Sequence, residues 1–207
     1  MKKPIVEDLV DAAVVRSAFK RKRVYRHTSL EDLGLDEAAT SELTARLYRT
    51  VSSEKHRLDF PDFRRKMALT PKTKVAGVAV GLSRVVLAGK RSRGAVFGDD
   101  PTRIKLAGDD PTPIKVSSDV AVCATLAEKV PNLDFLDVEP KLLLGKDLKL
   151  GDAEIEEIKI NLFQTLRPKQ GFEQFASSLK RINRNSSVKA LLASVTRALG
   201  TTDSWKL

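Results

Sequence analysis

Four carboxylates are the first side chains in this sequence that could do chemistry. Asp99, Asp100, Asp109 and Asp110 lie in two nearly identical copies, GDDPTRIKLA and GDDPTPIKVS, over residues 98–117. Four such oxygen donors could hold a divalent cation. Their spacing matches no calcium loop, however, and Asp-Asp-Pro-Thr is typical of turns, in which aspartate bonds to nearby amides and proline presets the backbone. The pattern therefore favours two structural turns over a metal site.

Catalytic groups of other kinds are isolated along the chain. His27 and His56 have no cysteine or second histidine at metal-ligand spacing, although either could act as a lone base. No serine has the glycine-flanked setting of a nucleophile elbow. Two Gly-Lys pairs, at 89–90 and 145–146, lack the first glycine of a phosphate loop. We therefore expect no cofactor and no metal, and a protein that is not an enzyme.

The composition indicates a globular chain with one thiol. Of the 207 residues, 42% are hydrophobic and 31% charged, which is typical of a chain that buries a core. Cys123 is the only cysteine, which excludes an internal disulfide and a cysteine-rich metal site. It lies in the apolar run 120–126, so we expect a buried thiol with a structural role.

The sequence predicts neither export nor membrane insertion. Acidic residues at 7, 8 and 11 follow the basic N-terminus where a signal peptide needs an apolar stretch. The longest apolar run, 75–89, contains Arg84 and is shorter than the roughly 20 residues of a bilayer span. We therefore expect an intracellular protein without a membrane partner, located in the cytoplasm, on the nucleoid or in a nucleus.

The net charge of +10 is distributed unevenly. Residues 1–30, 61–95 and 171–207 carry +5, +8 and +4, whereas 31–60 and 96–170 carry −3 and −4. Such alternation is typical of a protein that meets a polyanion, because each neutralised phosphate releases a counterion. Each run taken alone could be an ordinary solvated face. The three together favour nucleic acid as the partner.

The basic segments supply the candidate contacts with phosphate. Contacts of this kind give weak sequence preference. Because no aromatic residues alternate with the cations, duplex DNA or structured RNA is favoured over single strands. The candidate residues are Lys20, Arg21, Lys22, Arg23, Arg26, Arg64, Arg65, Lys66, Lys90, Arg91, Arg93, Lys180, Arg181 and Arg184.

Residues 1–70 are predicted to form helices. This is the first of three regions that carry the candidate cations. A helix follows Pro4, a short one starts at the capping sequence Ser29-Leu-Glu-Asp32 and stops at Gly34, and a longer one is capped by Asp36. A further helical turn contains the apolar residues of 60–67.

Residues 71–118 are predicted to be β-rich. Valines and four glycines over 74–97 suggest short strands, with a glycine-rich buried helix as the alternative. The duplicated sequence at 98–117 then predicts a small β-meander whose second strand, containing Pro113, lies at an edge. Strands here could present Lys90, Arg91 and Arg93 as a wing.

Residues 119–207 are predicted to be helical again, which makes the fold class α+β. Helices are expected over 119–129, 153–166, 172–182 and 188–199, the last stopped by Gly200. The last two could form a helix-turn-helix or a plain hairpin. The three regions could also pack as one compact domain.

Three functions are compatible with these observations. A non-enzymatic nucleic-acid-binding protein is favoured. The alternatives are a structural or assembly subunit of a larger particle, such as a virion or a ribonucleoprotein, with protein partners or self-association, and an enzyme with an unrecognised site.

Overall fold

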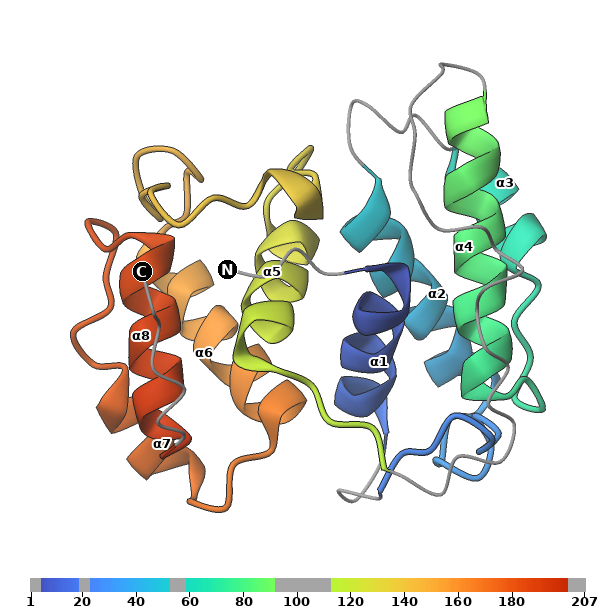
Figure 1. Ribbon diagram of the computed structural model, residues 1–207, viewed down its shortest axis with the longest axis horizontal. Coiled ribbons are helices and arrows are strands. Elements are labelled where there is room, and N and C mark those ends of the chain that lie inside the picture. The colour runs from blue at the N-terminus through green and yellow to red at the C-terminus, as the bar shows by residue number, and fades with distance from the viewer. Residues whose placement is uncertain (1–4, 19–22, 53–58, 92–112, 201–207) are drawn as a thin grey trace.

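A computed structural model shows that the protein is all-helical (Figure 1). It describes residues 5–18, 23–52, 59–91 and 113–200, with the backbone alone for 87–91. Within these ranges the only strand-like pairing is two isolated β-bridges, so the α+β prediction is wrong. The helices are α1 (Val6–Ser17), α2 (Glu37–Val51), α3 (Phe60–Met67), α4 (Val75–Arg91), α5 (Ser118–Lys129), the 3-10 turn η3 (Phe135–Asp137), α6 (Asp152–Leu166), α7 (Phe172–Ser178) and α8 (Val188–Ala198).

The segment predicted to be β-rich contains helix α4, which confirms the alternative of a glycine-rich buried helix. Its apolar residues recur at helical spacing, and Val75, Val78 and Leu82 are fully buried. Gly81 faces α3, where an added Cβ would lie 3.6 Å from the Met67 sulfur. Burial of one whole face therefore outweighs the low helix propensity of glycine and valine. The first copy of the predicted meander lies outside the described residues, and 113–117 forms no strand.

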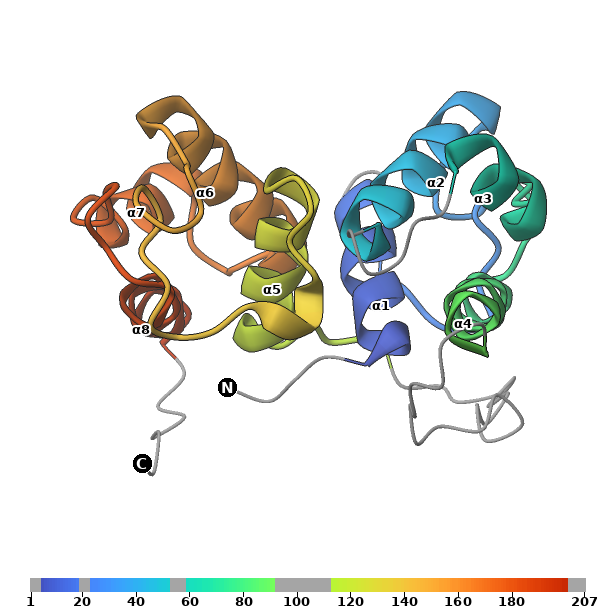
Figure 2. The same ribbon diagram turned by 90° about the horizontal axis from the view of Figure 1, so that it is seen from above.

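The helices form two units of four, which lie side by side along the long axis (Figures 1 and 2). The first unit contains α1 to α4 around one hydrophobic core, and the second contains α5 to α8 around another. The units pack through α1 and α2 on one side and α5 and α6 on the other. The first core extends across this contact to Ala127 and Phe135, so the two units bury apolar surface together.

Both units contain the same backbone arrangement, in which two loops are joined by a β-bridge directly before the last helix of the unit. We call this arrangement the backbone frame. In the first unit, the loops 23–36 and 68–74 meet at the bridge between Ser29 and Lys74. The Leu30 amide donates to the Thr73 carbonyl over 3.0 Å, and the next helix begins at Val75, whose amide donates back across the pair over 3.0 Å. We call the two bridged loops a loop pair.

The second unit forms the equivalent loop pair from 138–151 and 179–187. Its bridge joins Leu143 to Ser187, and the Leu144 amide donates to the Ser186 carbonyl over 2.9 Å. Val188 then opens α8 and donates to the Leu142 carbonyl over 2.9 Å, as Val75 does at the start of α4. The chain is therefore a structural duplication, although the only repeat visible in the sequence is the short one at 98–117.

Some helix boundaries follow the capping residues that the sequence shows, and others do not. Asp36 caps α2 as predicted, accepting from the Ala39 amide over 2.8 Å. Ser29 and Asp32 also bond to each other, but they close a turn and no helix follows. The predicted short helix is therefore wrong: the Leu33 and Gly34 amides donate to the Leu30 and Glu31 carbonyls within a single turn, which ends at Gly34 with a φ of 84°.

The C-terminal helix pair is present with a shorter first member. Helix α7 ends at Ser178, before the predicted boundary at 182, and Leu179 and Ile182 are buried in the turns that follow. Helix α8 agrees with the prediction, with Ser187 as its cap and Gly200 beyond its end at a φ of 65°. Within the described ranges, no helix is both long and apolar enough to cross a membrane.

Candidate nucleic-acid interface

The structure places the predicted N-terminal cations in different settings. Arg23 is exposed, whereas Lys20, Arg21 and Lys22 lie outside the described residues. The Arg26 guanidinium is partly buried and lies 2.7 Å from the Asp11 carboxylate, with Glu7 at 3.6 Å. Much of the charge of Arg26 is therefore neutralised within the first unit.

The cations of α3 and α4 belong to helices of the first unit. Arg64, Arg65 and Lys66 are exposed on α3, and Arg65 pairs with Asp62 one turn earlier over 2.7 Å. Lys90 and Arg91 end α4, so the wing predicted from strands is wrong at these two positions. The side chains of Lys90 and Arg91, like the whole of Arg93, lie outside the described part of the chain.

Lys180, Arg181 and Arg184 lie between α7 and α8, and all three are exposed. This segment and α3 belong to different units and lie at opposite ends of the long axis in both views (Figures 1 and 2). A single short contact could therefore involve one of these two sets, but not both.

The loop pair of the second unit adds cations that the sequence patterns assign to no site. Gly145 packs directly on Arg184: its amide donates to the Arg184 carbonyl over 2.7 Å, and a Cβ would lie 2.7 Å from the Arg184 Cβ. Lys146 comes directly after Gly145 and therefore lies where the two loops touch. The Lys189 amide donates to the Pro140 carbonyl over 2.9 Å, which places Lys189 beside Lys141.

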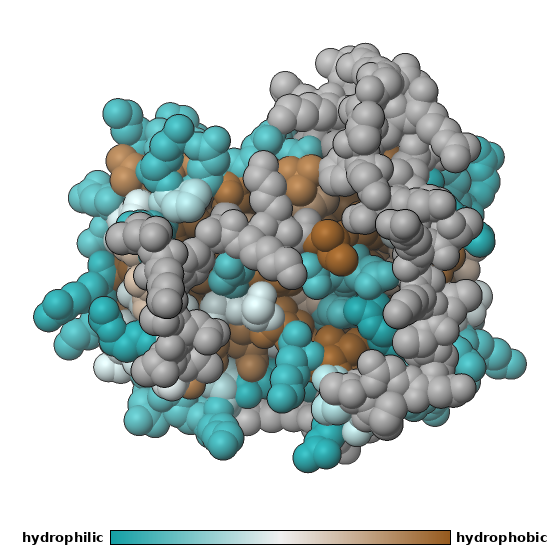
Figure 3. All heavy atoms as spheres, in the orientation of Figure 1, coloured by the Kyte–Doolittle hydropathy of each residue, from teal (hydrophilic) through white to brown (hydrophobic). Residues whose placement is uncertain are grey.

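These residues form one strongly basic surface, here called the loop-pair surface. Residues 174–200 contain five cations and no carboxylate. Carboxylates in the other loop are occupied: Glu139 pairs with Lys141 over 2.9 Å, and Asp147 accepts from the Leu143 amide over 2.8 Å. Hydrophilic side chains cover this end of the molecule, at the upper left of Figure 3. The loop-pair surface consists of Lys141, Lys146, Lys180, Arg181, Arg184 and Lys189, all exposed.

The equivalent loop pair of the first unit carries mixed charge. Lys72 and Lys74 are exposed there, but so are Glu31 and Asp32 of the facing loop. Bonds across the pair join these loops directly, because the Glu31 amide donates to the Pro71 carbonyl over 2.8 Å. The same frame therefore presents a nearly neutral surface in the first unit and a basic one in the second.

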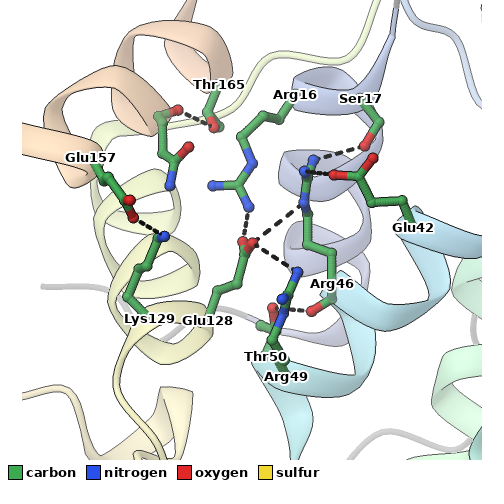
Figure 4. Close-up of polar contacts among 11 residues, drawn as sticks. Arg16, Ser17, Glu42, Arg46, Arg49, Thr50, Glu128, Lys129, Glu157 and Thr165 are labelled. Atoms are coloured by element: carbon green, nitrogen blue, oxygen red, sulfur yellow. Dashed lines mark hydrogen bonds and ion pairs between the residues drawn. The ribbon is translucent and has the colours of Figure 1, made fainter. Parts of the chain in front are cut away.

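A cluster of buried ionisable groups lies elsewhere, between the two units (Figure 4). Glu128 of α5 is surrounded by three arginines of the first unit: it contacts Arg16 and lies 3.4 Å from Arg46 and 3.7 Å from Arg49. The side chains of Arg16 and Glu128 are only 5% and 8% exposed. Burial and the nearby guanidiniums of Arg46 and Arg49 lower the pKa of Arg16 to about 9, so it stays charged at neutral pH.

This buried cluster has the features of a structural junction. The cavity beside it, between Arg16, Thr125 and Thr165, has a volume of about 10 Å³, which is roughly the space of one water. The carboxylate of Glu128 is already occupied by arginines. A larger open groove of about 570 Å³ borders the same residue, and Arg49, Glu154 and Glu157 also line it. The cluster therefore joins α1 and α2 to α5.

The isolated reactive side chains resemble ordinary structural residues. Cys123 is buried, and burial, with a smaller effect of Asp119, raises the pKa of its thiol to about 12. His27 is exposed and stacks on Tyr25 at 5.4 Å. His56 and the four aspartates of the duplicated turns lie outside the described residues. In the part of the chain that the structure describes, no three histidine, cysteine or acidic side chains gather as metal ligands.

Comparison with known proteins gives no relative from which a function could be transferred. No family model, no curated protein and no solved structure matches the chain.

Proposed function

We propose that the protein binds nucleic acid without catalysing a reaction, and that the loop-pair surface contacts the phosphate backbone. The observation that carries this proposal is that two loops meet at one bridge and that each carries exposed cations. The loop 179–187 has no carboxylate, and the two carboxylates of the loop 138–151 are engaged in contacts of their own. Lysine and arginine at this density gain affinity by releasing counterions from phosphates. An intracellular location goes with this proposal.

The surface favours a duplex or structured RNA with little base readout. It contains no aromatic side chain on which an unpaired base could stack. Its polar neighbours Asn183 and Asn185 are partly engaged with their own turn, since the Asn185 amide donates to the Asn183 side chain over 2.9 Å. Backbone contacts would therefore position the ligand, with weak sequence preference.

A structural subunit of a larger particle is the second candidate. It is favoured by the exposed cations Arg64 and Lys66 on α3, at the opposite end of the long axis from the loop-pair surface. Basic surfaces at both ends would let one chain join two acidic partners or two segments of nucleic acid.

The test is binding of a labelled DNA duplex and a structured RNA across a salt series. The double variant Lys146→Ala/Arg184→Ala is compared with Lys72→Ala/Lys74→Ala, which removes the same charge from the loop pair of the first unit. For duplex DNA, we expect the log–log salt slope of the first variant to become shallower by about 0.9 for each phosphate that it no longer neutralises. The control should keep the wild-type slope.

Equal reductions of the slope in the two variants would show that net charge alone drives binding, which would contradict the assigned surface. If neither ligand binds to the wild type at physiological salt, the nucleic-acid proposal fails. Sedimentation velocity on the same sample would then test self-association, as the assembly function requires.

A further inference from the structure

A second basic feature lies at the other end of α8, where the structure forms a groove. The groove runs between the connecting segment 113–117, the turn after α6 and the C-terminal end of α8, and its volume is about 820 Å³. This volume falls within the roughly 300–1,000 Å³ of small-molecule sites. The groove is distinct from the loop-pair surface, because Lys189 and Arg197 lie at opposite ends of α8.

The floor of this groove is apolar. Ile114 and Val116 of the connecting segment and Leu166 and Leu199 of the second unit line it. All four are partly buried and pack against the two hydrophobic cores, so they are fixed in place without the groove being filled. Such a floor can remove apolar ligand surface from water.

The rim of the groove is cationic. Lys115, Lys169 and Arg197 line it and are exposed, and none of them forms an ion pair with another described residue. Among the described residues that line the groove, none is an aspartate or a glutamate. Cations that form no ion pair with the described part of the chain, placed beside apolar surface, favour a ligand that is anionic at one end only.

The walls are held by internal hydrogen bonds. Arg167 also lines the groove, but its guanidinium is directed to the carbonyls of Val15 and Ala18 at the end of α1. The Gln170 amide donates to the Ala198 carbonyl over 2.8 Å, which ties the turn after α6 to α8. The groove is therefore preformed, as small-molecule sites usually are.

We propose that this groove binds a single-chain anionic amphiphile of the fatty-acid type. The carboxylate would lie among Lys115, Lys169 and Arg197, and the chain would lie along the apolar floor. A nucleic-acid backbone makes poorer use of the groove, because its repeated charges find no complement on Ile114, Val116 and Leu166. The inference is independent of the proposed function, since it uses a different surface.

The test is calorimetric titration with dodecanoate below its micelle concentration, using the full chain. We expect binding to the wild type and at least a tenfold loss of affinity in Lys169→Glu/Arg197→Glu. The control Lys180→Glu/Arg184→Glu makes the same charge change on the loop-pair surface and should bind dodecanoate like the wild type. Circular dichroism melts check that both variants fold, which we expect because all four side chains are exposed.

Four further ligands separate the contribution of the anionic head group from that of the apolar chain. Octanoate should bind more weakly than decanoate, by up to roughly tenfold for the two methylenes that it cannot place on the apolar floor. Dodecyltrimethylammonium, with the same chain and the opposite charge, should bind weakly, and inorganic phosphate should not displace dodecanoate. Failure of dodecanoate to bind, equal binding of the cationic amphiphile, displacement by phosphate, or full binding by the groove variant would each overturn the proposal.

Discussion

The two four-helix units share a backbone frame but place their charges differently. The first unit buries several ionisable side chains: Asp11 is 8% exposed, and Arg16 and Arg46 lie in the contact with the second unit. The second unit carries most of its cations on the surface, with none of the five in 174–200 buried. The frame depends on leucines and backbone hydrogen bonds, so the charges are free to differ. The proposed contact with nucleic acid therefore lies in the second unit, whereas the buried ionisable groups of the first belong to the architecture.

The largest effect expected from this comparison is at Glu128. Glu128→Ala removes the carboxylate that faces three arginines, and breaking such a buried pair costs about 3–5 kcal/mol. Urea denaturation measures this change in the free energy of unfolding. The matched change Glu157→Ala breaks the exposed pair with Lys129 and should cost less than about 1 kcal/mol. Similar costs for the two variants would contradict the structural role of the buried cluster.

A pH-dependent effect is expected at Asp11. Burial, with smaller contributions from the negative charges of Asp8 and Glu7, raises the pKa of this carboxyl to about 7 against the opposing effect of Arg26. Because the folded state holds the proton to higher pH than the unfolded state, the stabilising contribution is complete below about pH 4 and is lost as pH rises through 7. The slope should reach at most about 1.4 kcal/mol per pH unit.

Asp11→Asn should remove that contribution. The measurement is the free energy of unfolding of wild type and variant at pH 5, 6, 7 and 8. The difference between them should change from pH 5 to 7 and level off toward pH 8. A constant difference would show that Asp11 does not titrate there. Its unpartnered Oδ1, which accepts no hydrogen bond from any described residue, makes the protonated form the better fit.

A third effect distinguishes the glycines of the two units. Gly145→Ala would push a Cβ against Arg184, and overpacking of this kind typically costs about 1–3 kcal/mol. Gly77 on α4 has a single neighbour at 3.4 Å, the Thr73 methyl, so Gly77→Ala should stabilise the first unit by up to about 1 kcal/mol through helix propensity. Thermal unfolding followed by circular dichroism measures both. Stabilisation by Gly145→Ala would contradict the close loop contact.

The smallest effect concerns the start of the second helix in each unit. Asp36→Ala removes the side-chain cap of α2 and should cost about 1 kcal/mol. The corresponding position before α6 is Gly151, whose amide instead donates to Glu154 over 2.6 Å. Glu154→Ala should therefore weaken α6 while leaving α2 unchanged. Hydrogen exchange at the first amides of both helices reports each change separately.

Much of the helical structure could be predicted from the sequence, because its signals are local. The cap at Asp36, the apolar spacing in α6 and α8 and the stop at Gly200 all depend on residues within a few turns. The local composition of residues 74–97 favours strands, because it is rich in valine and glycine. The segment forms helix α4 instead because one face is buried against α1 and α3, and the local sequence does not reveal that burial. The short helix predicted at Ser29 is wrong for a different reason, since its capping residues close a single turn that ends at Gly34.

The candidate site was predictable only in part. Lys180, Arg181 and Arg184 were found because they cluster in sequence. Lys146 was not, because the contact between Gly145 and Arg184 joins segments about 40 residues apart. A glycine directly before a lysine gives no signal of this kind unless the facing backbone is known. Charge patterns identify segments, but only the fold shows which segments meet.

The contacts between the units also bear on the order in which the chain can fold during synthesis. Carbonyls at the end of α1 accept hydrogen bonds from Arg167, and arginines of α1 and α2 form ion pairs with Glu128. A ribosome completes the first unit before either residue has been made. Until α5 and α6 emerge, the carbonyls at the end of α1 lack the Arg167 donor, and of the three arginines that face Glu128 only Arg46 has another carboxylate, Glu42, among the described contacts. The first unit therefore reaches its full stability only after the second has been translated, which makes the later half of the chain a folding partner of the earlier one.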